Sequence, residues 1–341
     1  MRALLAFTVA CALWACAPIT APPGRTPTEP HLTEKAFVTH DGLALPLRRW
    51  LPEGAVKGVV VALHGFNDYA KAFDKIPAIM IGTGPYLAGQ GFAVYAYDQR
   101  GFGASPNAGL WPGEKALIAD FTDLAALLRR AHPGVPIYGL GESMGGAVIM
   151  AAVAGKAAGA QTPPVDGVVL AAPAVWARAT MPFYYRIPLW LGARLMPGFK
   201  PSPKGLGFQA SNNIDLLRDN ARDPLFIKET RVDAIYGLAT LMDAALASTT
   251  RIRVPTLYLY GAKDQIIPRK PTLQAMQGLG PNAKPAFYAQ GWHIVLRDKE
   301  AETVLKDVAA FMANPTAPLP SGADENAVDR LRTAPPPPKR K

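Results

Sequence analysis

Ser143 is the residue best placed to do chemistry, because it lies between two glycines in the run Gly141-Glu142-Ser143-Met144-Gly145. The apolar run 135–140 before it predicts a short buried strand, and residues 144–154, rich in Ala, Val, Ile and Met, predict a helix after it. A serine in a sharp strand-to-helix turn has a strained backbone and an exposed hydroxyl, and its flanking glycines avoid collisions with neighbouring elements. The same residues also suit an ordinary Gly/Ser turn, so the rest of the sequence must decide.

A nucleophilic serine needs a base to take its proton, and the chain offers five histidines. His31 lies in an N-terminal segment, His40 in a predicted hairpin turn, and His132 after a predicted helix. His64 follows a predicted strand, but its His-Gly-Phe turn is better suited to shaping an oxyanion site. His293 follows the last predicted strand directly, so we predict that it is the base.

The base in turn needs a carboxylate to hold it in the correct tautomer. Asp264 follows the predicted strand 256–260; an aspartate here can also form a turn or cap a helix. Its position argues for the catalytic role, because Ser143, Asp264 and His293 each follow a successive candidate strand and would converge on one edge of a parallel sheet. Asp298 is a poorer candidate because it falls beyond the histidine, in a segment leading into a helix.

The elements that must position these residues alternate between strand and helix along the chain. Residues 34–51 predict an opening antiparallel hairpin with Asp41-Gly42 as its turn. Continuous apolar runs then predict parallel strands that are covered on both faces, at 58–63, 92–97, 137–140, 167–170, 256–260 and 286–288. Helical patterns lie between them, at 117–130, 214–220, 234–247 and 300–311. The fold class is α/β, with helices on both faces of a mostly parallel sheet.

Composition divides the chain further. One globular domain is expected at 34–312, because 49% of the residues are hydrophobic and 18% are charged. The segment 174–253 is too long for a single crossover and predicts a helical lid, whose aromatic run 181–190 we expect to contribute to substrate entry. The Pro-rich segment 16–33 predicts a mobile tether, and the Pro-rich basic segment 313–341 a disordered tail. A short helix at 323–332 is a possible exception.

The N-terminus predicts export. Residues 1–15 combine one charge, Arg2, with an apolar run too short to span a bilayer, as in a secretory signal. The run Leu13-Trp14-Ala15-Cys16 resembles a bacterial lipobox, in which the cysteine becomes the lipidated first residue, although an ordinary cleaved signal is an alternative. The only other cysteine is Cys11, so the exported chain would have no internal disulfide. We expect anchoring at the cell envelope through Cys16, at the periplasmic face of the outer membrane.

The net charge of +10 is compatible with anionic lipid headgroups or cell-wall polymers. A nucleic-acid partner is not expected, because the basic residues are scattered and no nucleic-acid-binding motif is present. The sequence does not indicate an oligomeric state.

Several motifs together resemble the α/β-hydrolase fold, and within it the monoacylglycerol lipase and lysophospholipase branch that is grouped with serine aminopeptidases of type S33. Besides the serine turn, residues 64–68 (HGFND) resemble that branch's oxyanion turn and residues 97–105 its D-x-R-G-x-G-x-S segment. Gly261-Ala262-Lys263-Asp264 and Gly291-Trp292-His293 match its acid and base positions. The resemblance covers about residues 34–312 and is more specific for fold than for substrate.

The resemblance implies acyl transfer through an acyl-enzyme on Ser143, with His293 as base and Asp264 as its partner. The oxyanion donors would be the backbone N–H groups of Phe66 and Met144. Asp98 and Arg100 would brace the loops below the site, and Phe66, larger than its counterpart in some relatives, would narrow the acyl entrance. Neither a metal nor an organic cofactor is required.

The expected activity is hydrolysis of esters of single-chain lipids, either monoacylglycerols or lysophospholipids. A serine aminopeptidase of the same fold is an alternative, for which Asp215, Asp219, Asp223 and Glu229 in the predicted lid would have to bind a substrate amine. A non-catalytic surface lipoprotein with the same scaffold is a second alternative. It would be expected to lack a member of the triad, and all three residues are present.

Overall fold

The computed structural model describes residues 18–75, 81–155, 162–201 and 207–338. The predicted export signal 1–15 and Cys16 lie outside the described residues. Among the described residues, no helix has both the length and the apolar character needed to cross a bilayer.

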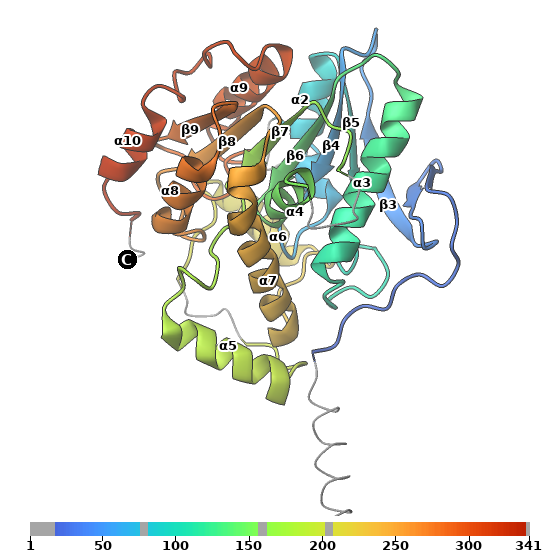
Figure 1. Cartoon of the computed structure of the whole chain (residues 1–341), viewed down its shortest axis with the longest axis vertical. Coiled ribbons are helices and arrows are strands. Elements are labelled where there is room, and N and C mark those ends of the chain that lie inside the picture. The colour runs from blue at the N-terminus through green and yellow to red at the C-terminus, as the bar shows by residue number, and fades with distance from the viewer. Residues whose placement is uncertain (1–17, 76–80, 156–161, 202–206, 339–341) are drawn as a thin grey trace, which may run out of the picture.

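A single nine-stranded sheet forms the centre of the protein, with the strand order β1-β2-β3-β5-β4-β6-β7-β8-β9 (Figure 1). Its first three strands pair antiparallel, and β3 is also antiparallel to β5, whereas all later pairings are parallel. The predicted fold class is therefore confirmed. The strands are β1 (His31–Leu32), β2 (Ala36–Val38), β3 (Ala44–Trp50), β4 (Gly58–Leu63), β5 (Phe92–Tyr97), β6 (Ile137–Glu142), β7 (Gly167–Ala171), β8 (Thr256–Gly261) and β9 (Ala283–Tyr288).

The central strands are buried at every residue because both faces of the sheet are covered. In β4, Val59 and Val61 pack into one hydrophobic core, whereas Val60 and Ala62 pack into the other. The first core lies under α3, α4, α7 and α8, and the second under η1, α2 and α9. The helices of the two layers are η1 (Ala70–Phe73), α2 (Thr83–Gly89), α3 (Glu114–Ala131), α4 (Met144–Val153), α7 (Val232–Ser248), α8 (Arg269–Gly278) and α9 (Ala301–Ala313).

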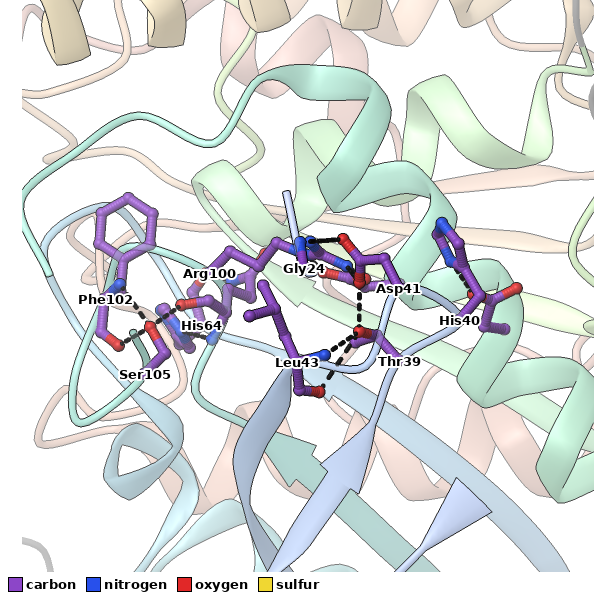
Figure 2. A network of polar contacts seen from close by, with 12 residues as sticks. Gly24, Thr39, His40, Asp41, Leu43, His64, Arg100, Phe102 and Ser105 are labelled. Atoms are coloured by element: carbon purple, nitrogen blue, oxygen red, sulfur yellow. Dashed lines mark hydrogen bonds and ion pairs between the residues drawn. The ribbon is translucent and has the colours of Figure 1, made fainter. Parts of the chain in front are cut away.

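The opening hairpin is held by its turn residue Asp41 (Figure 2). The Asp41 carboxylate accepts hydrogen bonds from Thr39 Oγ1, from the backbone N–H of Gly24 and from the guanidinium of Arg100. Gly42 completes the turn with φ +82°, a conformation that favours glycine. The predicted Asp41-Gly42 turn thus also ties the hairpin to the loop after β5.

Between β7 and β8 the chain forms α5 (Phe183–Leu195), α6 (Ile214–Arg222), α7 and η2 (Thr249–Arg251). The predicted lid at 174–253 includes too many residues, because α7 packs against α3, α4 and α8 as part of one helical layer. Helix α7 also packs closely on the loop before α3, since a Cβ on Gly237 would lie 2.3 Å from the Trp111 ring. Of the helices between β7 and β8, α5 projects from the body of the domain (Figure 1).

The N-terminal segment is attached to the domain over the part that the structure describes, so the predicted mobile tether at 16–33 is wrong for residues 18–33. Ile19 donates its N–H to Asp233, Thr20 pairs with Trp111, and Thr28 donates to the carbonyl of His40. Strand β1 then adds to the edge of the sheet. Backbone hydrogen bonds hold this segment even though it has few apolar side chains.

The C-terminal segment is also ordered, and the predicted disorder at 313–341 is wrong for residues 313–334. Helix α10 (Ala327–Thr333) buries Leu331 completely, and Leu319 is buried beside the opposite face of the sheet. Phe287 in the edge strand β9 donates its N–H to the carbonyl of Ala323. The segment therefore covers a sheet edge that would otherwise be exposed, which a compositional argument does not anticipate.

Candidate active site

Ser143 occupies the turn between β6 and α4 with φ 51° and ψ −110°, a conformation that a non-glycine residue adopts only when its surroundings impose it. The flanking glycines make the turn possible. A Cβ on Gly141 would lie 2.5 Å from the backbone of Gly145 and Gly146, and a Cβ on Gly145 would lie 2.2 Å from the carbonyl oxygen of Leu63. The expected strained strand-to-helix turn is therefore present.

The structure brings Ser143, Asp264 and His293 together at the carboxyl edge of the sheet. His293 Nε2 lies 2.9 Å from Ser143 Oγ, and His293 Nδ1 lies 2.8 Å from Asp264 Oδ2. The other oxygen of Asp264 accepts the N–H groups of Ile266 and Ile267. Because a carboxylate can only accept, the proton of a neutral His293 lies on Nδ1, and Nε2 faces the serine hydroxyl as an acceptor.

The electrostatic surroundings of His293 favour its protonated form. Burial by itself lowers the pKa of His293, but the charge and hydrogen bond of Asp264, together with Glu142 and Asp298, outweigh it and raise the pKa above its usual value. An imidazolium at this position is therefore stabilised by the neighbouring carboxylates.

Asp298 does not orient the histidine. Its carboxylate accepts the N–H of Trp292 at 2.6 Å and the hydroxyl of Ser211 at 2.6 Å. Burial raises the pKa of Asp298 to about 6. Asp298 therefore holds the backbone of the loop that carries His293, consistent with its being the poorer candidate for the acid.

The loop after β4 is held by His64, as the HGF turn suggested. His64 is buried, and its Nε2 accepts the N–H of Gln99 while its Nδ1 donates to the carbonyl of Gly65. Gly65 lies against Ser143, since a Cβ on it would be 3.5 Å from Ser143 Cβ. Burial lowers the pKa of His64, which keeps the ring neutral and structural.

The two predicted oxyanion donors belong to elements that flank Ser143. Met144 is the first residue of α4 and is fully buried. Phe66 follows Gly65 in the loop after β4, and its ring packs against Phe102 and Trp111 while also lining the cavity beside the serine. This is the position from which Phe66 can narrow the cavity.

Asp98 and Arg100, which were expected to brace the loops below the site, have different roles in the structure. Asp98 accepts the N–H groups of Ala70 and Ala104, which holds the segment after the oxyanion loop. Arg100 instead contacts Asp41 in the hairpin turn (Figure 2). It also donates to Asp120 in α3. Arg100 therefore stabilises the fold rather than the loops at the serine.

A cavity of about 360 Å³ opens beside Ser143 and His293. Most of its walls are apolar. From the chain between β7 and β8 they include Trp176, Phe208, Phe226, Leu238 and Met242, and beyond β8 they include Ile266, Ile267 and Ile294. The run 181–190 contributes no lining residue, so the expectation that it contributes to substrate entry is not supported by the lining of this cavity. In the structure these residues belong to α5 and the turn before it.

Three charged residues of this cavity were missed by sequence reasoning: Asp68, Glu142 and Arg297. All three are buried, and Arg297 donates to both carboxylates. A signal existed for Glu142, because a charged residue at the end of an otherwise apolar strand requires a buried partner. The sequence did not indicate which basic residue that partner would be.

The acidic residues with which a serine aminopeptidase was expected to bind a substrate amine do not line the cavity beside Ser143. Asp215 forms an exposed ion pair with Arg218, and Asp223 accepts from Tyr69 and Lys71. Neither these two nor Asp219 and Glu229 line the cavity beside Ser143. Within the described residues, the acidic groups that line this cavity are Asp68 and Glu142.

The chain is similar in sequence and in fold to known proteins. A model of the family described as "Serine aminopeptidase, S33" matches residues 54–300. The chain is 26% identical to a monoacylglycerol lipase of Mycolicibacterium smegmatis over 83% of this chain and 97% of that protein. It is 24% identical to a monoglyceride lipase of Mus musculus over 89% of this chain and 99% of that protein. The crystal structure of a Paleococcus ferrophilus monoacylglycerol lipase has the same fold, with a TM-score of 0.64 and 21% identity over 80% of this chain and 99% of that one.

Proposed function

Because the chain belongs to the serine aminopeptidase S33 family and the matched segment includes Ser143, Asp264 and His293, we propose that it is a serine hydrolase that cleaves carboxylic esters of single-chain lipids. The observation that carries the proposal is the pair of hydrogen bonds joining Ser143, His293 and Asp264 beside an apolar cavity. The named relatives are monoglyceride lipases, which agrees with an ester of one acyl chain.

In the proposed reaction, Ser143 Oγ attacks the ester carbonyl while His293 Nε2 takes the hydroxyl proton. Asp264 stabilises the imidazolium through the hydrogen bond to Nδ1. His293 then returns the proton to the oxygen of the departing alcohol, which leaves the acyl group on Ser143. A water molecule then attacks the acyl-enzyme with His293 as base, which releases the carboxylic acid and regenerates the free serine.

The oxyanion of each tetrahedral intermediate is proposed to accept hydrogen bonds from the N–H groups of Phe66 and Met144. Met144 begins α4, so its amide has the partial positive charge of a helix N-terminus. The Phe66 amide belongs to a loop held in place by His64 and Gln99. Such preorganised donors stabilise charge that develops only during the reaction.

The test is hydrolysis of a p-nitrophenyl ester, a monoacylglycerol and a lysophospholipid by the purified full chain. Ser143→Ala should reduce kcat by roughly 10⁴- to 10⁶-fold, and a fluorophosphonate should label the wild type but not the variant. The control Thr303→Ala removes an exposed hydroxyl from helix α9 and should have no effect on activity. Hydrolysis that survives in Ser143→Ala would refute the assignment.

The family description keeps a serine aminopeptidase as a second candidate. If the protein is an aminopeptidase, it should cleave an aminoacyl p-nitroanilide at a rate comparable to that of the esters. The same protein preparation distinguishes the two, because an aminopeptidase requires a free substrate amine and loses activity when the amine is acetylated.

We further propose that the protein is exported and held at the bacterial cell envelope by a lipidated Cys16, on the periplasmic face of the outer membrane. Ile19 donates to Asp233 in the first turn of α7, and α5 packs on α7, so the first described residues lie near α5 (Figure 1). Helix α5 has one buried residue, Ala193. Large apolar side chains are exposed along it, namely Phe183, Tyr184, Tyr185, Ile187, Trp190, Leu191 and Leu195.

An exposed aromatic and aliphatic helix such as α5 is suited to lie on a membrane surface. The anchor is tested by envelope fractionation and fatty-acid labelling of the full chain. Cys16→Ser should abolish labelling, whereas Cys11→Ser should leave it intact. Labelling that persists in Cys16→Ser would refute the anchor.

A further inference from the structure

The loop after β4, which carries the Phe66 amide, is held on one side by the insertion between β7 and β8. The contacts come from residues 223–230, which follow α6 and which we call the strap. Ile227 of the strap donates its N–H to the carbonyl of Asn67 at 3.0 Å. The side-chain amide of Asn67 donates to the hydroxyl of Thr230 at 2.7 Å. Both contacts join the strap to the residue that directly follows Phe66.

Two further contacts join the strap to the residues that follow Asn67. Tyr69 Oη and Lys71 Nζ both donate to Asp223 Oδ2, at 2.7 and 2.6 Å. The Asp223 side chain is only 9% exposed. Burial by itself raises the pKa of Asp223, but the hydrogen bonds from Lys71 and Tyr69 outweigh it and lower the pKa below its usual value. Asp223 is therefore charged at neutral pH, and its charged hydrogen bonds hold the strap against the loop.

The Phe66 amide depends on its neighbours for its orientation. Its N–H donates to no backbone carbonyl among the described residues, so it remains available as the proposed oxyanion donor. The start of the loop is held by His64, and Asp68 is held by Arg297. Between them, Asn67 has φ +68°, a conformation that a non-glycine residue keeps when neighbouring contacts impose it. The strap supplies two of the contacts that fix Asn67.

The strap also forms part of the cavity wall beside the serine. Phe226 lines the cavity together with Phe66, and Ile227 packs against the larger hydrophobic core. A wall that only limited the size of the acyl group would not require hydrogen bonds to the loop after β4. The four hydrogen bonds between the strap and this loop therefore indicate a second role.

We propose that Asn67 and Thr230 are positioning residues of the oxyanion site, through which the insertion controls the rate of acyl transfer as well as the shape of the cavity. This inference rests on the proposed ester hydrolysis at Ser143. Oxyanion donors stabilise the developing charge only from the correct position, and a displacement of about 1 Å can cost roughly 100-fold in rate. Releasing Asn67 from the strap should therefore change kcat.

The test is hydrolysis of p-nitrophenyl acetate and p-nitrophenyl laurate by the full chain in detergent. Both esters form the same oxyanion, but an acetyl group is too short to fill an apolar cavity of about 360 Å³. Thr230→Val keeps the shape of the side chain and removes the hydroxyl that accepts from Asn67. It should lower kcat on both esters by the same factor, roughly 10- to 100-fold, and leave KM unchanged.

Thr230→Ser keeps the hydroxyl and should retain most of the wild-type kcat. Thr303→Val, the same substitution as Thr230→Val at an exposed threonine of α9, is the matched control and should have no effect. Asn67→Gly removes the other partner of the hydrogen bond and accommodates the positive φ. If Thr230→Val does not fold, Asn67→Gly decides the question with the same two esters.

The double variant Asn67→Gly/Thr230→Val separates a shared role from two independent ones. Because both substitutions break the same hydrogen bond, the double variant should lose no more kcat than the less active single variant. Fully additive losses would show that the two residues act independently, which overturns the proposal.

An unchanged kcat in folded Thr230→Val would also overturn the positioning role. So would a rise in KM for the laurate alone, because the strap would then act only as a wall for the acyl chain. A wild-type chain that hydrolyses neither ester refutes the proposed function itself. An active wild type with fully active Thr230→Val and Asn67→Gly variants refutes only the positioning role.

Discussion

Gly145→Ala tests the reasoning about the serine turn, because the added methyl group has no room. Its Cβ would lie 2.2 Å from the carbonyl oxygen of Leu63 and 2.6 Å from the carbonyl carbon. Real Cβ atoms essentially never approach other atoms closer than 3.0 Å, so α4 and the end of β4 must separate by about 0.8 Å. Backbone cannot yield as a flexible side chain can, and the accommodation should cost about 1–3 kcal/mol of stability.

This displacement should damage catalysis more than folding. Leu63 leads directly into the loop that carries the Phe66 amide, whereas Gly145 lies next to the Met144 amide on the other side of the serine. Separating β4 from α4 therefore separates the two proposed oxyanion donors. A misplacement of about 1 Å can cost roughly 100-fold in rate, so we expect kcat to fall by that factor or more.

The assay is kcat on a soluble p-nitrophenyl ester, with thermal unfolding measured on the same samples. Gly89→Ala is the matched control, because a Cβ on Gly89 meets nothing within 4 Å and Gly89 ends helix α2. That substitution should be neutral or stabilise by up to about 1 kcal/mol. A Gly145→Ala protein with kcat within threefold of the wild type would refute the link between the packing of the turn and the oxyanion donors.

Three further predictions concern His293, the C-terminal segment and the Arg100 network. His293 must be neutral to act as base, and its pKa is raised, so kcat/KM on a soluble ester should fall on acidification with a midpoint above pH 6.5. Asp264→Asn should lower both this midpoint and kcat. A wild-type midpoint below pH 6.5 would contradict the reasoning. Leu331→Ala should lower the free energy of unfolding by about 2–5 kcal/mol, as measured by chemical denaturation, whereas exposed Arg332→Ala should not; equal stabilities would show that α10 does not contribute. Arg100→Met leaves Asp120 buried without its cation and should destabilise by about 3–5 kcal/mol, and an unchanged denaturation midpoint would contradict that role.

The fold and the triad geometry were accessible to sequence reasoning because each depends on local signals. Apolar runs predicted strands β4 to β9 to within a few residues, since both faces of those strands are covered. The chain order of Ser143, Asp264 and His293 predicted their convergence, since parallel strands share one carboxyl edge. The hydrogen bonds among these residues follow from that topology.

The predictions for the chain ends and for the aromatic run 181–190 were wrong because they were based on amino-acid composition, which does not indicate what a segment packs against. Proline-rich segments predicted mobile ends, yet residues 18–33 and 313–334 pack against the sheet through backbone hydrogen bonds and a few buried side chains such as Leu331. The aromatic run 181–190 indicated substrate entry, but the cavity is lined by other parts of the insertion. Whether an apolar segment faces a cavity or solvent depends on its neighbours in space.

The α/β architecture and the three residues proposed for acyl transfer can be predicted from the amino-acid sequence, because apolar runs, turn glycines and the order of the strands are local features of the chain. The surroundings of the serine depend instead on contacts between distant segments. Asp68, Glu142 and Arg297 are far apart in sequence, and their ion network exists because three loops end at the same edge of the sheet. A charged residue in an apolar strand indicates that a buried partner is needed, but the partner is known only once the chain has folded.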